Sequence, residues 1–177
     1  IIIQGYLIAF LFMAVHEAAH KTVFTSRRLN EALGHVSSLM IVLPYEHYAL
    51  FHWDHHRFTQ DPDRDPELVT ATIPSSDTRL AIAYTGIVQL TNRIRLLVRR
   101  AVIEQAVAPW IPESKQSMVV REARIYALVY LVLLIASIAF SSMMLLWCWL
   151  VPLYVGQLFL RPYLYAEHTG CERTRSA

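Results

Sequence analysis

The sequence predicts an all-helical integral membrane protein, and three observations carry that prediction. Hydrophobic residues make up 55% of the 177 residues and charged residues 17%, with a mean hydropathy of +0.34. That balance is too apolar for an ordinary soluble domain of this length. An uncharged run of 36 residues, 125–160, is long enough to supply two membrane-spanning helices. Histidines also recur three and four residues apart, the spacing that places side chains on one face of a helix.

The N-terminal segment predicts the first membrane-spanning helix. Residues 1–15 carry no charged side chain. At about 1.5 Å per residue they cover about 22 Å, short of the roughly 30 Å hydrocarbon core. The sequence begins with Ile1 instead of Met, so we expect a chain truncated at both ends, with more of this span before Ile1. Lys21, Arg27 and Arg28 follow, which predicts that the span emerges on the cytoplasmic side.

The segment 34–51 is predicted to lie at the membrane interface. Its uninterrupted apolar portion, 36–43, is only eight residues long, because Pro44, Glu46 and His47 break the pattern. Such a stretch is too short to cross the bilayer. A single crossing here would also separate the histidines that precede it from those that follow it. We therefore expect a re-entrant or interfacial helix.

Two further segments precede the long apolar run. Residues 61–67 combine two prolines with alternating acidic side chains, which favours a loop over a helix. Residues 80–102 alternate apolar side chains with Arg93, Arg95, Arg99 and Arg100. This basic amphipathic pattern predicts a helix that lies in the interface against anionic headgroups.

The uncharged run 125–160 predicts two helices joined by a tight turn. One helix of this length would measure about 54 Å, more than a tilted span accommodates. A turn near Ser141–Ser142 divides the run into spans at about 122–141 and 144–163, besides the span at about 1–15. The outer flanks are basic and the turn is not, so both outer ends are predicted to be cytoplasmic. The whole chain, 1–177, is then a single membrane domain.

Five histidines are spaced for metal binding. His52, His55 and His56 occupy positions i, i+3 and i+4, so one helical turn presents three imidazoles in one direction. His16 and His20 are four residues apart and share a face of another helix. Neutral imidazole binds iron, zinc, copper and nickel, and the number of histidines alone does not choose among them.

These two motifs resemble the histidine boxes of the membrane fatty acid desaturase superfamily. Its di-iron oxidases carry a box H-x-x-x-H, a box H-x-x-H-H and another H-x-x-H-H near the C-terminus. Residues 16–20 match the first box and 52–56 the second, and Ala166-Glu167-His168 is similar to the isolated ligand that precedes the last box. The last box is missing, so we expect a fragment that is inactive alone. The resemblance covers nearly the whole chain.

The resemblance implies a set of six iron ligands: His16, His20, His52, His55, His56 and His168. Six imidazoles are too many for one tetrahedral zinc and suit two metal ions. The implied function is that of an oxidoreductase, a fatty acid desaturase that introduces a double bond into a lipid acyl chain. It would use two iron ions and dioxygen, because no side chain can remove hydrogen from an unactivated methylene.

The same resemblance implies the partners and the location. Electrons would come from a ferredoxin or a b-type cytochrome. The protein would reside in the bacterial cytoplasmic membrane or the endoplasmic reticulum, with the histidine boxes facing the cytosol. No basic tract with interleaved aromatic residues is present, so nucleic-acid binding is not predicted.

Acidic residues beside the histidines are candidates for orienting them. Glu17, Asp54 and Glu167 each adjoin a candidate ligand and could hydrogen-bond to an imidazole. Sequence neighbours on a helix point in different directions, so solvated carboxylates are the alternative reading. The other candidates are predicted to be structural: Asp61, Asp63 and Asp65 in a turn, and His35 and His47 in the core or interface.

Three alternative functions remain open. The closest is a lipid, alkane or carotenoid hydroxylase or ketolase of the same superfamily, because the boxes indicate dioxygen chemistry and not its product. The segment 16–20 also reads H-E-x-x-H, the motif of intramembrane zinc metalloproteases, which would leave the second box without a role. A metal transporter would need polar residues along the spans, and 125–160 offers little besides serines and Gln157.

Overall fold

The computed structural model describes residues 1–70, 76–103 and 108–168, with side chains described as far as Ala166 at the C-terminal end. Throughout this described part the chain is helical and contains no strand, which confirms the predicted all-helical class. In chain order the helices are α1 (Ile2–His20), α2 (Arg27–Met40), α3 (Tyr45–Phe58), α4 (Pro66–Thr70), α5 (Asp77–Tyr84), α6 (Ile87–Ile103), α7 (Glu113–Ala139), the π-helical turn η1 (Leu146–Leu150) and α8 (Val151–His168).

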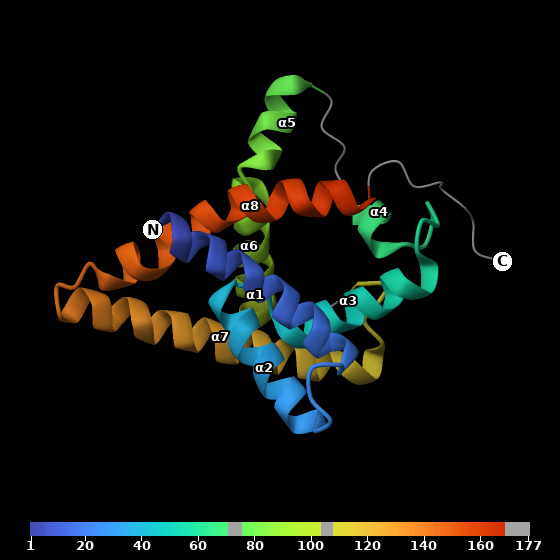
Figure 1. Cartoon of the computed structure of the whole chain (residues 1–177). Helices are drawn as coiled ribbons and strands as arrows, with labels where there is room; N and C mark the ends of the chain where they lie inside the picture. The colour runs from blue at the N-terminus through green and yellow to red at the C-terminus, as the bar shows by residue number, and fades with distance from the viewer. Residues whose placement is uncertain (71–75, 104–107, 169–177) are drawn as a thin grey trace.

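Helix α1 packs along α8, and two glycines allow the backbones to approach closely (Figure 1). A Cβ built on Gly156 would lie 2.7 Å from the carbonyl oxygen of Gly5, and one on Gly5 would lie 2.9 Å from the carbonyl oxygen of Pro152. Neither contact tolerates a side chain. Small residues at such crossings are typical of helices that associate in membranes, where close backbone packing drives association.

Tyr45 locks α1, α2 and α3 together at the start of α3. Its ring occupies the space of a Cβ on Gly34, 2.3 Å away, so only glycine fits at that position of α2. Its hydroxyl donates a hydrogen bond of 2.9 Å to the carbonyl of Ala18 in α1. Ala18 lies between His16 and His20, so this contact fixes the histidine-bearing end of α1 relative to α3.

Among the residues that the structure describes, two helices are long and apolar enough to cross a membrane. They are α1, with a mean hydropathy of 1.6, and α7, with 1.8. Helix α1 continues past the predicted limit at 15, whereas α7 begins before the predicted limit at 122 and ends at Ala139, just before the predicted limit at 141. The predicted break in the uncharged run is present: α7 ends at Ala139, and Ser141 adopts a left-handed conformation with φ of 47°. The chain then returns through η1 into α8 (Figure 1).

The prediction of one interfacial helix over 80–102 is wrong in two respects. Gly86, at φ of 70°, breaks the segment into α5 and α6, and a Cβ there would lie 2.5 Å from the side chain of Gln157 in α8. The arginines also do not share one exposed face, because Arg100 is buried and the Nη1 atom of Arg93 is buried without a hydrogen-bond partner in the described part. Contact with α7 and α8 therefore outweighs the simple amphipathic pattern.

Candidate metal centre

Two helices bring four of the predicted histidines together. His16 and His20 lie on the last turns of α1, and His52 and His56 lie one turn apart on α3. One ligand atom from each lies within 4.8 Å of those of the other three. The ring centroids of His16 and His52 are 4.4 Å apart, as are those of His52 and His56. We call these four residues the histidine cluster.

Three nitrogen atoms of the histidine cluster converge on one point. The Nε2 atoms of His20 and His52 are 2.9 Å apart, those of His52 and His56 are 3.0 Å apart, and those of His20 and His56 are 3.2 Å apart. Each Nε2 of a neutral imidazole either carries a proton or presents a lone pair. Among three atoms at least two must be alike, so at least one pair repels whatever the tautomers. A cation that accepts all three lone pairs removes this conflict.

The spacing of the three atoms fits a metal ion. With metal–nitrogen bonds of about 2.1 Å, ligands at right angles lie about 3.0 Å apart and tetrahedral ligands about 3.4 Å apart. The distances of 2.9, 3.0 and 3.2 Å match three ligands on one face of an octahedron. The spacing is therefore that of histidines that would hold one metal ion through their Nε2 atoms.

Glu17 holds His16 in one tautomer. The Nδ1 atom of His16 lies 3.0 Å from Oε1 of Glu17 and donates to it, which leaves the Nε2 lone pair for a ligand. The other carboxylate oxygen of Glu17 accepts a hydrogen bond of 2.7 Å from the hydroxyl of Thr22. The sequence predicted Glu17 as one of the carboxylates that could orient a ligand. The structure places it in contact with His16, a member of the histidine cluster.

His55 adjoins the histidine cluster but turns its Nδ1 atom elsewhere. That atom lies 2.8 Å from Oδ1 of Asp65 and 3.4 Å from Oε2 of Glu67. Asp65 is fully buried and also accepts the backbone N–H groups of Gln60 and Glu67. With its proton on Nδ1, His55 presents its lone pair at Nε2. A buried carboxylate that fixes an imidazole in this way is a common support for a metal ligand.

Sequence reasoning missed Asp65 by assigning it to a turn. The turn is real, since the chain folds back at 61–65, but α4 begins at Pro66, inside the predicted loop. Two prolines flanking alternating acids signalled a tight reversal directly after the second box. They did not indicate which of the three aspartates would return to α3 and become buried.

The remaining predicted residues lie in other places. Asp54 lines a separate hollow with Arg57, Arg64 and Trp110. His47 is half-buried beside Phe51 and Trp110. His35 of α2 contacts Glu122 of α7 near the start of α3, at the opposite end of that helix from the histidine cluster. The side chains of Glu167 and His168 lie outside the described residues, although α8 reaches His168.

Electrostatics keep the cluster histidines of α3 neutral. Burial, and then the neighbouring imidazoles, lower the pKa of His52 to about 3. Burial and the same neighbours also lower the pKa of His56. At neutral pH both side chains are therefore uncharged, and a neutral imidazole is the form that binds metal.

Comparison with known proteins also points to a family of metal-dependent enzymes, as the geometry of the histidine cluster does. The family model described as fatty acid desaturase matches residues 1–177. An sn-1 acyl-lipid omega-3 desaturase (ferredoxin) from Synechocystis is 36% identical over 64 residues, 36% of this chain and 18% of the relative. A zeaxanthin 4-ketolase from Chlamydomonas reinhardtii is 38% identical over 64 residues, 35% of this chain and 14% of the relative.

One relative aligns along nearly the whole chain. An acyl-lipid omega-3 desaturase (cytochrome b5) of the endoplasmic reticulum from Arabidopsis thaliana is 22% identical over 177 residues, 94% of this chain and 46% of the relative. The chain thus spans less than half the length of these relatives. No solved structure matches it significantly.

Proposed function

Because this chain belongs to the fatty acid desaturase family, we propose that it is the metal-holding part of a membrane oxidoreductase that introduces a double bond into a lipid acyl chain. The observation that carries the proposal is the convergence of three Nε2 atoms within 3.2 Å of one another. Bound iron would supply the reductive activation of dioxygen that no side chain provides.

The ligand roles divide between two iron ions. His16, His20, His52 and His56 would hold one ion. His55 would contribute to the second through Nε2, because Asp65 engages its Nδ1. His168 is the sixth proposed ligand, since α8 runs antiparallel to the uncharged part of α7 and ends at this residue.

Apolar side chains cover one side of the histidine cluster, where His52 is buried, while His16 and His20 are half-buried and His56 is exposed. Val15, Ala18 and Ala19 surround the cluster residues of α1 and are at most 1% exposed. The ring of Tyr48 stacks on that of His52, with centroids 5.3 Å apart and an angle of 11° between the planes. Exclusion of water strengthens metal–ligand interactions and protects reactive species from side reactions.

We further propose that α1, α7 and η1–α8 span the membrane as parts of one domain over 1–177, with the histidine cluster on the cytosolic side. The basic residues at 21–28 and at 121–124 support this orientation. The relatives act on acyl lipids and take electrons from ferredoxin or cytochrome b5, as their names state. A lipid acyl substrate and a donor of one of these two kinds are therefore proposed here.

A ketolase or hydroxylase is the second candidate, because one of the matching relatives is a zeaxanthin 4-ketolase. The same four histidines would serve either product, and only product analysis separates the two. The zinc protease alternative needs Glu17 to activate water. Instead, Glu17 is engaged by His16 and Thr22, and two histidines of α3 complete an all-histidine set.

The test is the metal content and product of the native protein that contains this chain, purified in detergent, compared with a His55→Ala variant. Two irons and a new carbon–carbon double bond, both diminished by the substitution, would support the desaturase. A product that carries oxygen would favour the ketolase or hydroxylase. One zinc without iron would contradict both.

A further inference from the structure

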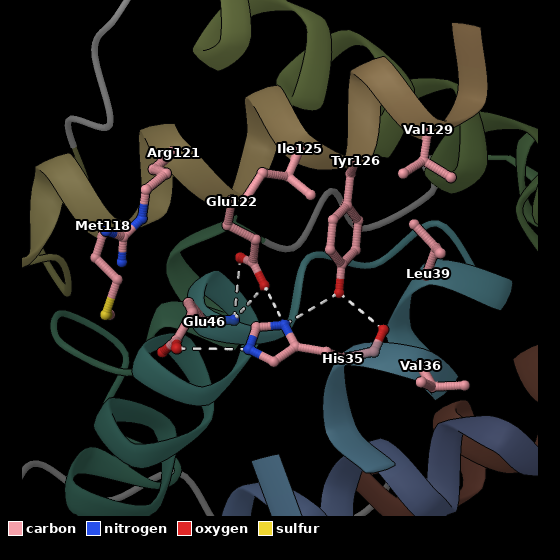
Figure 2. A pocket seen from close by; sticks show the side chains of 10 residues that line it. All are labelled: His35, Val36, Leu39, Glu46, Met118, Arg121, Glu122, Ile125, Tyr126 and Val129. Atoms are coloured by element: carbon pink, nitrogen blue, oxygen red, sulfur yellow. Dashed lines mark hydrogen bonds and ion pairs between the residues drawn. The ribbon is translucent and has the colours of Figure 1, made fainter. Parts of the chain in front are cut away.

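A hollow of about 370 Å³ lies between α2, α3 and α7, apart from the histidine cluster (Figure 2). Charged side chains, Glu46 and Arg121, lie at one end of it, and Val36, Leu39 and Val129 lie at the other (Figure 2). We call it the α2–α7 hollow. Its volume is within the range of small-ligand sites, and most of its wall is apolar, as in such sites.

The deepest charge of the hollow is neutralised by the protein itself. Glu122 of α7 is buried, and both of its carboxylate oxygens accept the backbone N–H of Glu46, at 3.0 and 3.1 Å. This contact caps α3, because Pro44, the residue at the N-cap position just before the helix, provides no side-chain cap. The Nδ1 atom of His35 lies 3.2 Å from Glu122 and compensates its charge. Glu122 therefore has little capacity left for a ligand.

Two charges of opposite sign retain capacity for a ligand, because Glu46 has only a long ion pair with His35 and Arg121 has no side-chain partner among the described residues (Figure 2). The nearest cation to the Glu46 carboxylate is Nε2 of His35 at 3.7 Å, beyond hydrogen-bond distance. Arg121 is exposed on α7 and makes no hydrogen bond or ion pair with another described side chain. A half-buried carboxylate and a guanidinium thus stand at the same end of the hollow, ready for a ligand that carries both charges.

The direction of the hollow matches that of a lipid in a bilayer. Val129 lies eight residues beyond Arg121 along α7, which is about 12 Å along the helix axis. If α7 spans the membrane, Arg121 is near the interface and Val129 is in the hydrocarbon. The polar end then meets headgroups and the apolar end meets acyl chains. This step rests on the proposed membrane location of α7 and is independent of metal binding.

We propose that the α2–α7 hollow binds a phospholipid with an ethanolamine headgroup, its phosphate on Arg121, its ammonium on Glu46 and an acyl chain along Leu39 and Val129. A choline headgroup has no N–H to donate to Glu46. A glycerol headgroup has no cation and brings an anion toward two carboxylates. Of these three headgroups, only ethanolamine combines a phosphate for Arg121 with an N–H cation for Glu46.

This lipid is bound apart from the reaction site. Tyr45 stands between the two, with its ring 4.9 Å from that of His35 and its hydroxyl on the carbonyl of Ala18. A lipid that holds Glu46 would fix the first turn of α3, the helix that carries His52 and His56. The bound lipid would therefore contact the start of α3 without being a substrate of the histidine cluster and without being needed for its metal.

The test is lipid retention by the purified chain, delipidated in detergent and offered dioleoyl phosphatidylethanolamine, phosphatidylcholine or phosphatidylglycerol. Native mass spectrometry should find the ethanolamine lipid retained roughly tenfold over the other two, because a charged hydrogen bond is at stake. Glu46→Gln should abolish the preference for ethanolamine over choline while keeping the fold. Equal retention of all three lipids, or preference for phosphatidylglycerol, would overturn the proposal.

A pair of tryptophan variants on α7 provides the matched control. Val129→Trp fills the apolar end and should remove the lipid, whereas Leu131→Trp, two residues further along and so on the opposite, exposed face of the same helix, should not. Loss in both variants, or in neither, would contradict the assigned site. Metal content measured on the same samples should be unchanged, which separates this proposal from that for the histidine cluster.

Discussion

Histidines lie near both ends of α3, the histidine cluster at its C-terminal end and His35 of α2 near its start, and their surroundings are opposite in chemistry. At the histidine cluster, imidazoles face one another and their Nε2 atoms cannot all be satisfied by hydrogen bonds. At His35, the imidazole faces the carboxylate of Glu122 and the hydroxyl of Tyr126. The first arrangement lowers the pKa of His52, mainly by burial, whereas the hydrogen bond to Glu122 raises that of His35. The candidate metal site thus differs from the His35 site in that its Nε2 atoms lack a full set of hydrogen-bond partners within the protein.

The largest expected difference is in metal binding. His52→Ala removes the nitrogen atom that lies within 3.0 Å of two other Nε2 atoms, so iron affinity should fall roughly a hundredfold or more. His35→Gln should leave iron content unchanged, because the ring nitrogens of His35 contact Glu122 and Glu46 and lie apart from the histidine cluster. Iron per chain, measured by plasma mass spectrometry after anaerobic loading, checks both. Equal loss in the two variants would remove the distinction between the ends of α3.

The next effect should be on stability, at the His35 end. Glu122→Ala leaves the start of α3 uncapped and His35 without its carboxylate, which should cost about 3 kcal/mol of unfolding free energy. Glu122→Gln should cost less, since the amide oxygen can still accept the N–H of Glu46. Denaturant titration in detergent compares the two. A larger loss for glutamine than for alanine would refute the capping role.

A smaller effect is expected where a carboxylate orients a ligand. Asp65→Asn keeps the shape of the side chain but weakens its hold on Nδ1 of His55, and should lower metal affinity about tenfold to a hundredfold. Asp63→Asn, in the same turn, is the matched control and should change little. Competition with a chelator gives both affinities. An unchanged affinity in Asp65→Asn would show that His55 needs no such partner.

The smallest effect is a pH dependence at the His35 end. The pKa of His35 is raised, chiefly by Glu122, so its contribution to stability is complete below the ordinary histidine pKa of about 6.5 and is lost as pH rises through the raised value. Burial raises the pKa of Glu46, and that contribution changes in the same direction. The other facing groups are Glu31, Tyr45, Arg121 and Tyr126.

Thermal unfolding between pH 6 and pH 8 measures this dependence. The midpoint should fall with rising pH in the native chain, and the fall should be smaller in His35→Gln. A midpoint that rises with pH, or an identical slope in the variant, would contradict the assignment to His35.

The sequence predicted the parts of the fold that depend on local pattern. The i, i+4 spacing placed His16 with His20, and His52 with His56, on helix faces that the structure brings together. The uncharged run gave two helices and the turn near Ser141. Hydropathy and periodicity act over a few residues, so one sequence is enough to read them.

The features of the fold that the sequence did not predict depend on contacts between residues far apart in the chain. Gly86 breaks a helix because Gln157 lies against it, and Glu122 caps α3 by accepting the N–H of Glu46, 76 residues earlier in the chain. Asp65 looked like a turn residue because its burial against His55 arises only when the turn folds back. Arg100 was predicted to face lipid headgroups, but its side chain is buried. In each case a tertiary partner overrides the local pattern.

The most direct test of the central claim is X-ray absorption at the iron edge of the iron-loaded chain. If the histidine cluster holds iron through Nε2 atoms, the first shell should contain nitrogen or oxygen at about 2.1 Å. The outer shells should show the multiple scattering of about four imidazoles, diminished in His52→Ala. A first shell with sulfur, or one without imidazole scattering, would contradict the account.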